Sequence, residues 1–357
     1  MIYLLLFAGL FMGWSLGSID AAGAFGTAVA TRVIKYRDAI IIIAIFVIIG
    51  AFVGGQNNIG NVADLATNNG VIASAETVYD AIENNLVEVL RLKSALKAFI
   101  VFACAAITVF SMSYLKLPVS ANQSITGAII GWGLFYADYS NPEVLAVNLP
   151  QIGKFASTWI LNPLGAGLIS FAIVKLFNKF ISNKLTTLSG YDKIIKVGYL
   201  IAGSFASISI GLNSSANVTS LYFDAVYEQT GVAANLLTDA RLAATIGGIA
   251  IAIGVLTFSK RVMMTVGSGI ANITQIDGFL VILAMALTVL IMRNLMGIPV
   301  STTQAIVGAV IGAGLTRGVS QVNFGVFKRI AVAWVTSPTV SGLLTYLVAL
   351  ATQSYFN

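Results

Sequence analysis

Two short segments of similar sequence carry many of the polar side chains that could bind a ligand in this apolar chain. They read KLPVSANQSITGAIIGWGL from Lys116 and MGIPVSTTQAIVGAVIGAGL from Met296. In each segment the proline ends one helix and the next serine can cap another, which predicts helix N-termini at Ser120 and Ser301. Free N–H groups and the positive end of a helix dipole make such a terminus an anion site. The expected chemistry is reversible binding of one tetrahedral oxyanion between two helix tips.

The side chains expected at this substrate site are neutral hydrogen-bonding groups, namely Ser120, Asn122, Gln123, Ser124, Ser301, Thr302, Thr303 and Gln304. Neither stretch from proline to glutamine contains Arg or Lys, which suits a site that must release its ligand. An alternative interpretation is ordinary N-capping of two helices whose small side chains pack closely together.

Asp20 is the one acidic residue expected within the membrane, where a carboxylate costs about 3 kcal/mol and usually serves a function. Its expected partner is a sodium ion or a proton. Sodium would be bound by Asp20 and by carbonyl groups freed where the helix unwinds near Gly17 and Gly23. The full set of residues expected to bind the coupling ion is Asp20, Asn213, Asn217, Gln123 and Gln304. Asp20 and Asn213 are also expected at the substrate site. Alternatively, Asp20 accepts the proton of a monohydrogen anion, or simply caps a helix that begins at Ala21.

The composition places these residues in an all-α polytopic membrane protein. Of 357 residues, 57% are apolar and 10% are charged, against about 25% charged in a soluble domain. The chain has no histidine and one cysteine, Cys104, which leaves little for catalysis or for a metal centre. We therefore expect no enzyme activity and no cofactor. The net charge of +6 is scattered between apolar spans, so it does not predict nucleic-acid binding.

Apolar stretches long enough to cross a bilayer predict ten crossings. The first is expected to be interrupted near Gly17–Gly23 and the sixth near Gly211–Asn217. The ten ranges are 2–31, 38–54, 94–115, 119–136, 152–174, 197–220, 241–258, 276–296, 299–316 and 327–351.

The distribution of charge predicts the orientation of these crossings. Placing Arg32, Lys35 and Arg37 in the cytoplasm puts both termini outside and most of the 20 Lys and Arg inside. Residues 56–93 then form an extracellular excursion, and residues 181–196 form a Lys-rich cytoplasmic linker.

The chain contains an internal repeat. Besides the Pro-Val-Ser pair, Trp159 and Pro163 match Trp334 and Pro338, and GSIDAAGAF from Gly17 matches GLNSSANVT from Gly211. Residues 1–180 and 197–357 are therefore expected to be two repeats of five crossings each. An odd number of crossings inverts the second repeat relative to the first. In such inverted repeats, broken helices and hairpin-like segments meet near the membrane midplane and bind substrate.

At these residues the chain resembles the inorganic phosphate transporter (PiT) family of ion-coupled symporters. The family's duplicated signature reads approximately GxNDxANA, followed in each half by PVSTTxxxxGAxxGxGL. IPVSTTQAIVGAVIGAGL at 298–315 matches strongly, PVSANQSITGAIIGWGL at 118–134 more loosely, and KRVMMTVGSGIANI at 260–273 resembles a further family loop. The first GxNDxANA copy keeps Asp20 but has Ile19 and Gly23 in place of both asparagines. The second copy keeps Asn213 and Asn217 but has Ser214 in place of the aspartate.

The resemblance implies symport of inorganic phosphate (HPO₄²⁻ or H₂PO₄⁻) with Na⁺ or H⁺, by alternating access between two inverted halves. The expected protein is thus a multi-pass phosphate importer of the plasma membrane, embedded in lipid. A homodimer is one form that it could take. A transporter of sulfate or another oxyanion is the main alternative, and a passive channel or membrane enzyme is a third. Asp20 favours phosphate because a carboxylate can accept a hydrogen bond from HPO₄²⁻ but not from sulfate.

Overall fold

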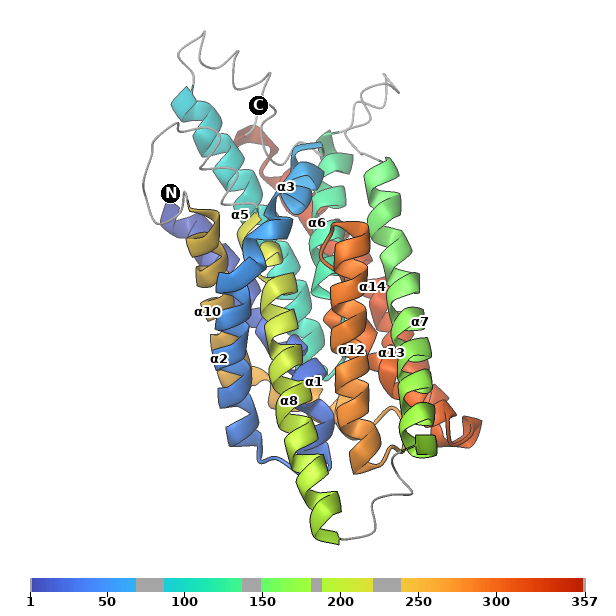
Figure 1. Cartoon of the computed structure of the whole chain (residues 1–357). Coiled ribbons are helices and arrows are strands. Elements are labelled where there is room, and N and C mark those ends of the chain that lie inside the picture. Colours follow the sequence, from blue (N-terminus) through green and yellow to red (C-terminus); the bar gives the residue numbers. More distant parts are fainter. Residues whose placement is uncertain (1, 69–86, 137–148, 181–187, 221–238, 356–357) are drawn as a thin grey trace.

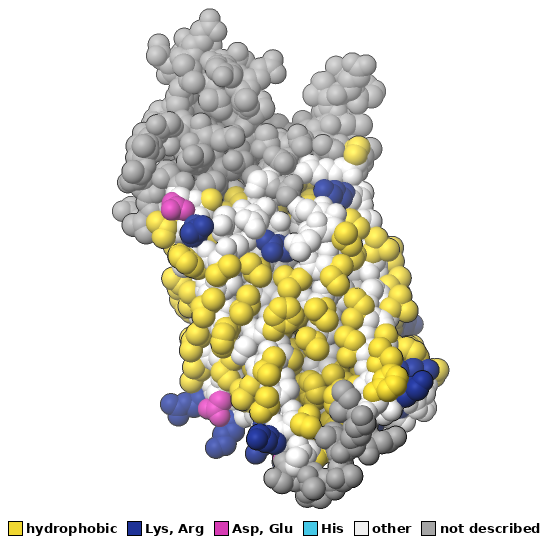
Figure 2. Space-filling model, viewed as in Figure 1, with side chains coloured by type: hydrophobic (Ala, Val, Ile, Leu, Met, Phe, Trp, Pro, Cys, Tyr) yellow, Lys and Arg dark blue, Asp and Glu magenta, His cyan; other side chains and the backbone are white. Residues whose placement is uncertain are grey.

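Long apolar helices pack side by side into one bundle in the computed structural model (Figure 1). The structure describes residues 2–68, 87–136, 149–180, 188–220 and 239–355. Seven helical stretches in these ranges are long and apolar enough to cross a membrane. Hydrophobic side chains form a broad belt around the visible face, and Lys and Arg lie toward its two ends (Figure 2). The chain is therefore a multi-pass helical membrane protein.

The helices longer than five residues are α1 (Ile2–Ala30), α2 (Tyr36–Gly54), α3 (Ile59–Asn68), α5 (Val87–Tyr114), α6 (Ala121–Tyr136), α7 (Leu149–Phe180), α8 (Leu188–Ser214), α10 (Ala240–Phe258), α11 (Lys260–Ser268), α12 (Gln275–Met296), α13 (Thr302–Leu315) and α14 (Phe324–Ala351). Short 3₁₀ turns lie at η1 (Gly55–Asn58), η4 (Val319–Gln321) and η5 (Gln353–Tyr355).

The two Pro-Val-Ser segments form helical hairpins, as the sequence predicts. Helices α6 and α13 have 16 and 14 residues, or about 24 and 21 Å, which is short of the roughly 30 Å of a hydrocarbon core. Each is preceded by a non-helical stretch, so part of each predicted crossing (119–136 and 299–316) is non-helical chain. The reversal before each stretch uses left-handed backbone, at Lys116 (φ 63°) and at Gly297 (φ 64°).

The helices pack in a pattern that repeats with exchanged partners. Helix α1 packs on α10 while α2 packs on α8, and α6 packs on α14 while α13 packs on α7. Helix α5 packs on α1 as α12 packs on α8. A two-fold relation between the halves would give this pattern. In that relation the helices correspond in chain order, α1 with α8, α2 with α10, α5 with α12, α6 with α13 and α7 with α14. Helix α1 begins and α14 ends at one end of the bundle, whereas α7 ends and α8 begins at the other (Figure 1).

The predicted interruption of the first crossing is wrong, because α1 is a continuous helix through Gly17 and Gly23. Gly17 lies where a side chain would overlap the carbonyl oxygen of Ile251 on α10, and a Cβ on Gly23 would lie 3.1 Å from Met285 Cε. These glycines therefore allow close packing and do not unwind the helix. In the sixth crossing the helix is broken at one residue, Ser215, within the predicted range.

The predicted excursion 56–93 and the predicted linker 181–196 both contain helix. Within the predicted excursion 56–93, η1 and α3 follow α2 directly, and Ile59, Val62 and Leu65 are buried. Residues 69–86 lie outside the described residues. Of the predicted linker 181–196, residues 188–196 already belong to α8, and residues 181–187 are not described.

Candidate functional site

The two hairpin helices meet end to end inside the bundle. Ser301 caps α13 by accepting a hydrogen bond from the Gln304 N–H (3.2 Å), and Ser120 accepts one from the Gln123 N–H (3.3 Å). The Thr303 hydroxyl at the start of α13 donates to the Val119 carbonyl before α6 (2.7 Å). The caps are those predicted from the Pro-Val-Ser pattern. Two helix N-termini from distant parts of the chain therefore lie against one another.

Asp20 lies beside these tips and is 3% exposed. One carboxylate oxygen accepts a hydrogen bond from the Thr302 hydroxyl on α13, and the other accepts one from the Ser214 hydroxyl on α8 (2.8 Å). Asp20 is in the interior of α1, so it does not cap a helix that begins at Ala21. One buried carboxylate thus joins three helices, α1, α8 and α13.

Asn213 fixes the backbone of the second Pro-Val-Ser segment. Its amide donates to the Val300 carbonyl (2.7 Å) and accepts from the Val300 N–H (2.9 Å), so it pairs with both peptide groups of a non-helical residue. Asn162 on α7 donates to the neighbouring Ser301 carbonyl (2.6 Å). Asn213 thus supplies the hydrogen bonds that the buried, non-helical Val300 would otherwise lack, and Asn162 adds a second bond to a carbonyl that also accepts from the Ala305 N–H. Asn213 therefore positions the tip of α13 as well as lying near Asp20.

Asn217 and Asn122 also join the two halves. The amide of Asn217, which follows α8, donates to the Asn122 side-chain carbonyl at the start of α6. The Asn122 Nδ2 has no hydrogen-bond partner although it is buried. An unpaired buried donor costs free energy, and such groups often mark binding sites. Asn122 thus has an N–H group free to bind an anion.

A small polar cavity lies at the centre of this arrangement. Its volume is about 10 Å³, and it is lined by Leu16, Asp20, Ala121, Asn122, Ser214, Val300, Ser301, Thr302 and Thr303. That volume holds about one water-sized species. The oxygen-rich lining, with one carboxylate, suits a hard cation or a proton more than a soft metal. The expected oxyanion is larger than this cavity, so it would fit only if the helix tips moved apart.

The predicted glutamines lie elsewhere. Gln123 and Gln304 line a larger, mostly apolar cavity of about 1010 Å³ between α6, α7, α13 and α14. Gln304 has no partner for either amide atom, and Gln123 Oε1 is also unpaired. The cavity around Asp20 is lined by other residues, so the role of the two glutamines in ion binding stays a prediction. Ser124 donates to the Ser120 carbonyl (3.3 Å) within α6.

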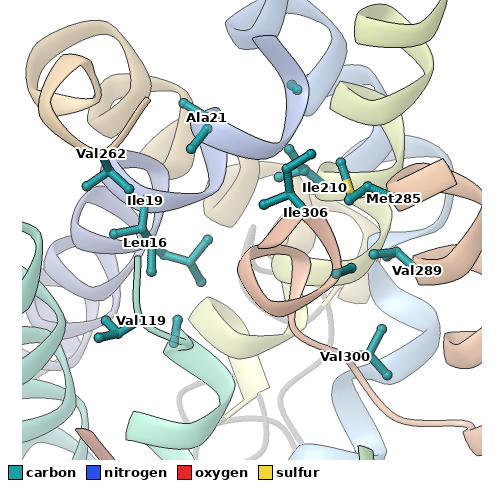
Figure 3. Close-up of a cluster of buried hydrophobic side chains, with 14 of the residues drawn as sticks. Leu16, Ile19, Ala21, Val119, Ile210, Val262, Met285, Val289, Val300 and Ile306 are labelled. Atoms are coloured by element: carbon teal, nitrogen blue, oxygen red, sulfur yellow. The ribbon is translucent and has the colours of Figure 1, made fainter. Parts of the chain in front are cut away.

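Apolar side chains surround the polar centre. Figure 3 shows Leu16 and Ile19 on α1, Val119 and Val300 beside the two tips, and Ile306 on α13 among buried neighbours. This surrounding excludes water and lowers the local dielectric constant, which strengthens the hydrogen bonds to Asp20. Charge at Asp20 is therefore costly unless a cation or proton neutralises it.

The structure adds two residues that the sequence interpretation did not place in the site. Ser214 binds Asp20, and Asn162 binds the Ser301 carbonyl. Ser214 occupies the position that corresponds to Asp20 in the second copy of the repeat, and this correspondence was the available signal. Asn162 precedes Pro163, which was recognised only as a repeat marker.

The fold and the site together define a class of protein. A multi-pass helical bundle encloses a polar centre where two hairpin helices meet one buried carboxylate, and such a centre is typical of secondary transporters. The class is thus a membrane transporter.

Comparison with known proteins identifies the family. The profile of the phosphate transporter family matches residues 16–345, so the chain belongs to this family. A "putative phosphate permease" of Pyrococcus abyssi is 26% identical, over 97% of this chain and 96% of its own. The sulfate permease CysP of Bacillus subtilis is 27% identical over 95% of this chain and 84% of its own. A solved structure titled "The sodium-dependent phosphate transporter" has the same fold, with a TM-score of 0.76, 23% identity and 99% of both chains covered.

Proposed function

We propose that this protein imports inorganic phosphate across the plasma membrane by symport with sodium ions or protons. The observation that carries the proposal is the buried Asp20 carboxylate, which binds hydroxyl groups from both α8 and α13 beside two helix N-termini. Family membership supports phosphate as the substrate.

The electrostatics of the site explain why an anion would require a coupling ion. Helix tips and neutral donors such as Asn122 attract an anion, but the Asp20 carboxylate repels it. A sodium ion or proton bound at Asp20 removes this repulsion. Each ligand then binds more tightly when the other is present, and this reciprocity is the basis of coupled transport.

Separation of the tips would give the alternating access that the proposal requires. The Thr302–Asp20 and Thr303–Val119 hydrogen bonds both join α13 to elements of the first half. Breaking them would open the cavity without unfolding a helix. The pairing of helices with exchanged partners supports two inverted halves that rock around this centre.

Replacement of Asp20 tests the proposal. Asp20→Asn keeps the shape of the side chain but removes the charge that binds the cation, so we expect gradient-driven phosphate uptake in proteoliposomes to be abolished. Asp38→Asn, in the first turn of α2 and outside the site, is the matched control and should transport normally. Uptake by Asp20→Asn that still follows a sodium or proton gradient would refute the proposal.

Sulfate is the second candidate substrate, because a sulfate permease is among the relatives. Both anions are tetrahedral, and the neutral donors at the helix tips do not distinguish them by charge. Phosphate brings a proton that the Asp20 carboxylate can accept in a hydrogen bond, whereas sulfate has none. We therefore expect excess unlabelled phosphate, but not sulfate, to suppress labelled phosphate uptake. Stronger suppression by sulfate would reverse the assignment.

A further inference from the structure

A second polar feature lies away from Asp20, where α10 ends and α11 begins. A pocket of about 650 Å³ is lined by Lys116, Thr257, Phe258, Lys260, Arg261, Met264 and Thr265. Three of these residues are cationic, and no acidic residue lines the pocket. The described part of the chain also places no carboxylate within salt-bridge distance of them. The positive charge of the pocket is therefore unneutralised by the described residues.

The cations are held in place by aromatic rings. The Arg261 guanidinium lies over the Tyr114 ring (4.7 Å) and near the Phe258 ring (5.5 Å), and it donates to the Tyr114 carbonyl (3.4 Å). The Lys260 ammonium lies over Tyr36 (5.6 Å). Lys116 stands at the left-handed reversal that follows α5. Rings that orient a guanidinium leave its N–H groups free to bind an oxyanion in a defined geometry.

An aromatic cluster adjoins the pocket. Phe11, Trp14, Phe110 and Phe258 contact one another with ring centroids 5.3–6.5 Å apart, and the Trp14 indole donates to Thr257 (2.8 Å). Thr257 and Phe258 belong to both the cluster and the pocket wall. The two features therefore form one surface with a cationic part and an apolar part.

This surface is on a different face of α1 from the transport site. Asp20 lies six positions after Trp14 on α1, which puts their side chains about 120° apart around the helix. Ser18, on the same side as Trp14, pairs with Ser113 of α5 (2.9 Å). The cluster thus faces outward between α1, α5 and α10, and helix α1 separates it from Asp20. The pocket and the Asp20 cavity share no lining residue.

We propose that this pocket binds an anionic phospholipid of the cytoplasmic leaflet. The phosphate would lie between Lys116, Lys260 and Arg261, and an acyl chain would lie along Phe258 and Trp14. The predicted orientation assigns all three cations to the cytoplasmic side, where basic pockets between helices bind lipid headgroups. A free anion would gain nothing from the apolar wall, whereas a lipid uses both parts of the surface.

Native mass spectrometry of the purified transporter tests this proposal with phosphatidylglycerol and phosphatidylcholine. We expect phosphatidylglycerol to bind preferentially, and Lys260→Gln with Arg261→Gln to weaken it about fivefold for each charge removed. The matched control is Lys328→Gln with Arg329→Gln on α14, which removes the same charge at the same predicted end but away from the pocket. Equal weakening in both double variants would mean general surface attraction and overturn the proposal. Displacement of the lipid by inorganic phosphate alone would also overturn it.

A second measurement uses the unaltered pocket. Phosphatidylglycerol with brominated acyl chains should quench Trp14 fluorescence more strongly than brominated phosphatidylcholine does, because its acyl chain would lie against the indole. The chain has 4 tryptophans, so Trp14→Phe defines the Trp14 contribution by difference. Equal quenching by the two lipids would contradict the proposal even if the charge variants fail to fold.

Discussion

At the scale of single residues, Asn213 shows how a non-helical backbone is tolerated within a membrane. It satisfies both the N–H and the carbonyl of Val300, at 2.9 and 2.7 Å. Asn213→Ala would leave both groups buried and unpaired, at about 1–3 kcal/mol for each. We expect a large drop in the melting temperature of the purified protein and loss of uptake. Asn162→Ala removes one of two hydrogen bonds to the Ser301 carbonyl, which still accepts from the Ala305 N–H (3.1 Å), so it should cost less; an equal or larger loss would contradict this account.

The residues of the site were predictable to the extent that their chemistry is unusual in a membrane. A lone acid in an apolar stretch identified Asp20, and the paired Pro-Val-Ser motifs identified the caps at Ser120 and Ser301. Only the repeat correspondence with Asp20 pointed to Ser214, because buried serines in membrane helices commonly bond to their own backbone, as Ser207 does to Gly203. The amide pairing of Asn213 was also missed, since the sequence does not indicate which buried carbonyl groups lack helical partners.

At the scale of helices, glycines set how closely the hairpin helices approach their neighbours. A side chain on Gly308 of α13 would overlap the Pro163 carbonyl of α7, and one on Gly127 of α6 would overlap the Pro338 carbonyl of α14. The two contacts are equivalent, because each joins a hairpin helix to the proline of the matching helix in the internal repeat. The sequence suggested a helix break around Gly17, where the structure shows the same close approach. Glycine in an apolar stretch indicates contact or unwinding equally, and only the neighbouring helix distinguishes them.

Substitution of these glycines tests their packing role. Gly308→Ala and Gly127→Ala should each force the helices apart, lowering stability by about 1–3 kcal/mol or preventing insertion. Gly165→Ala on α7 is the control, because its nearest new contact is an ordinary 3.8 Å to Thr288. That change should be neutral or slightly stabilising, since alanine favours helix. Thermal unfolding in detergent measures all three variants, and unaltered stability of Gly308→Ala would show that the crossing is looser than the structure indicates.

At the scale of the whole molecule, a multi-pass bundle of apolar helices followed from hydropathy, because lipid requires apolar stretches of fixed length. Hydropathy did not predict that α1 packs on α10 and α2 on α8. Those contacts join distant parts of the chain, and they depend on small residues such as Gly211 and Gly254 that permit close approach. The orientation of the bundle in the membrane is the remaining prediction at this scale, and it depends on the distribution of Lys and Arg.

Labelling of single cysteines tests that orientation in intact cells. With Cys104 replaced by alanine, we expect Gln353→Cys after α14 to react with a membrane-impermeant maleimide from outside. Lys193→Cys on α8 and Ser320→Cys before α14 should react only after the cells are permeabilised, because positive loops remain in the cytoplasm. All three positions are exposed or lie at the bundle ends, so access to the reagent is not limited by packing. Labelling in the reverse sense would invert the predicted orientation but keep two opposed halves. Labelling of Gln353→Cys and Lys193→Cys from the same side would contradict the inverted arrangement on which alternating access depends.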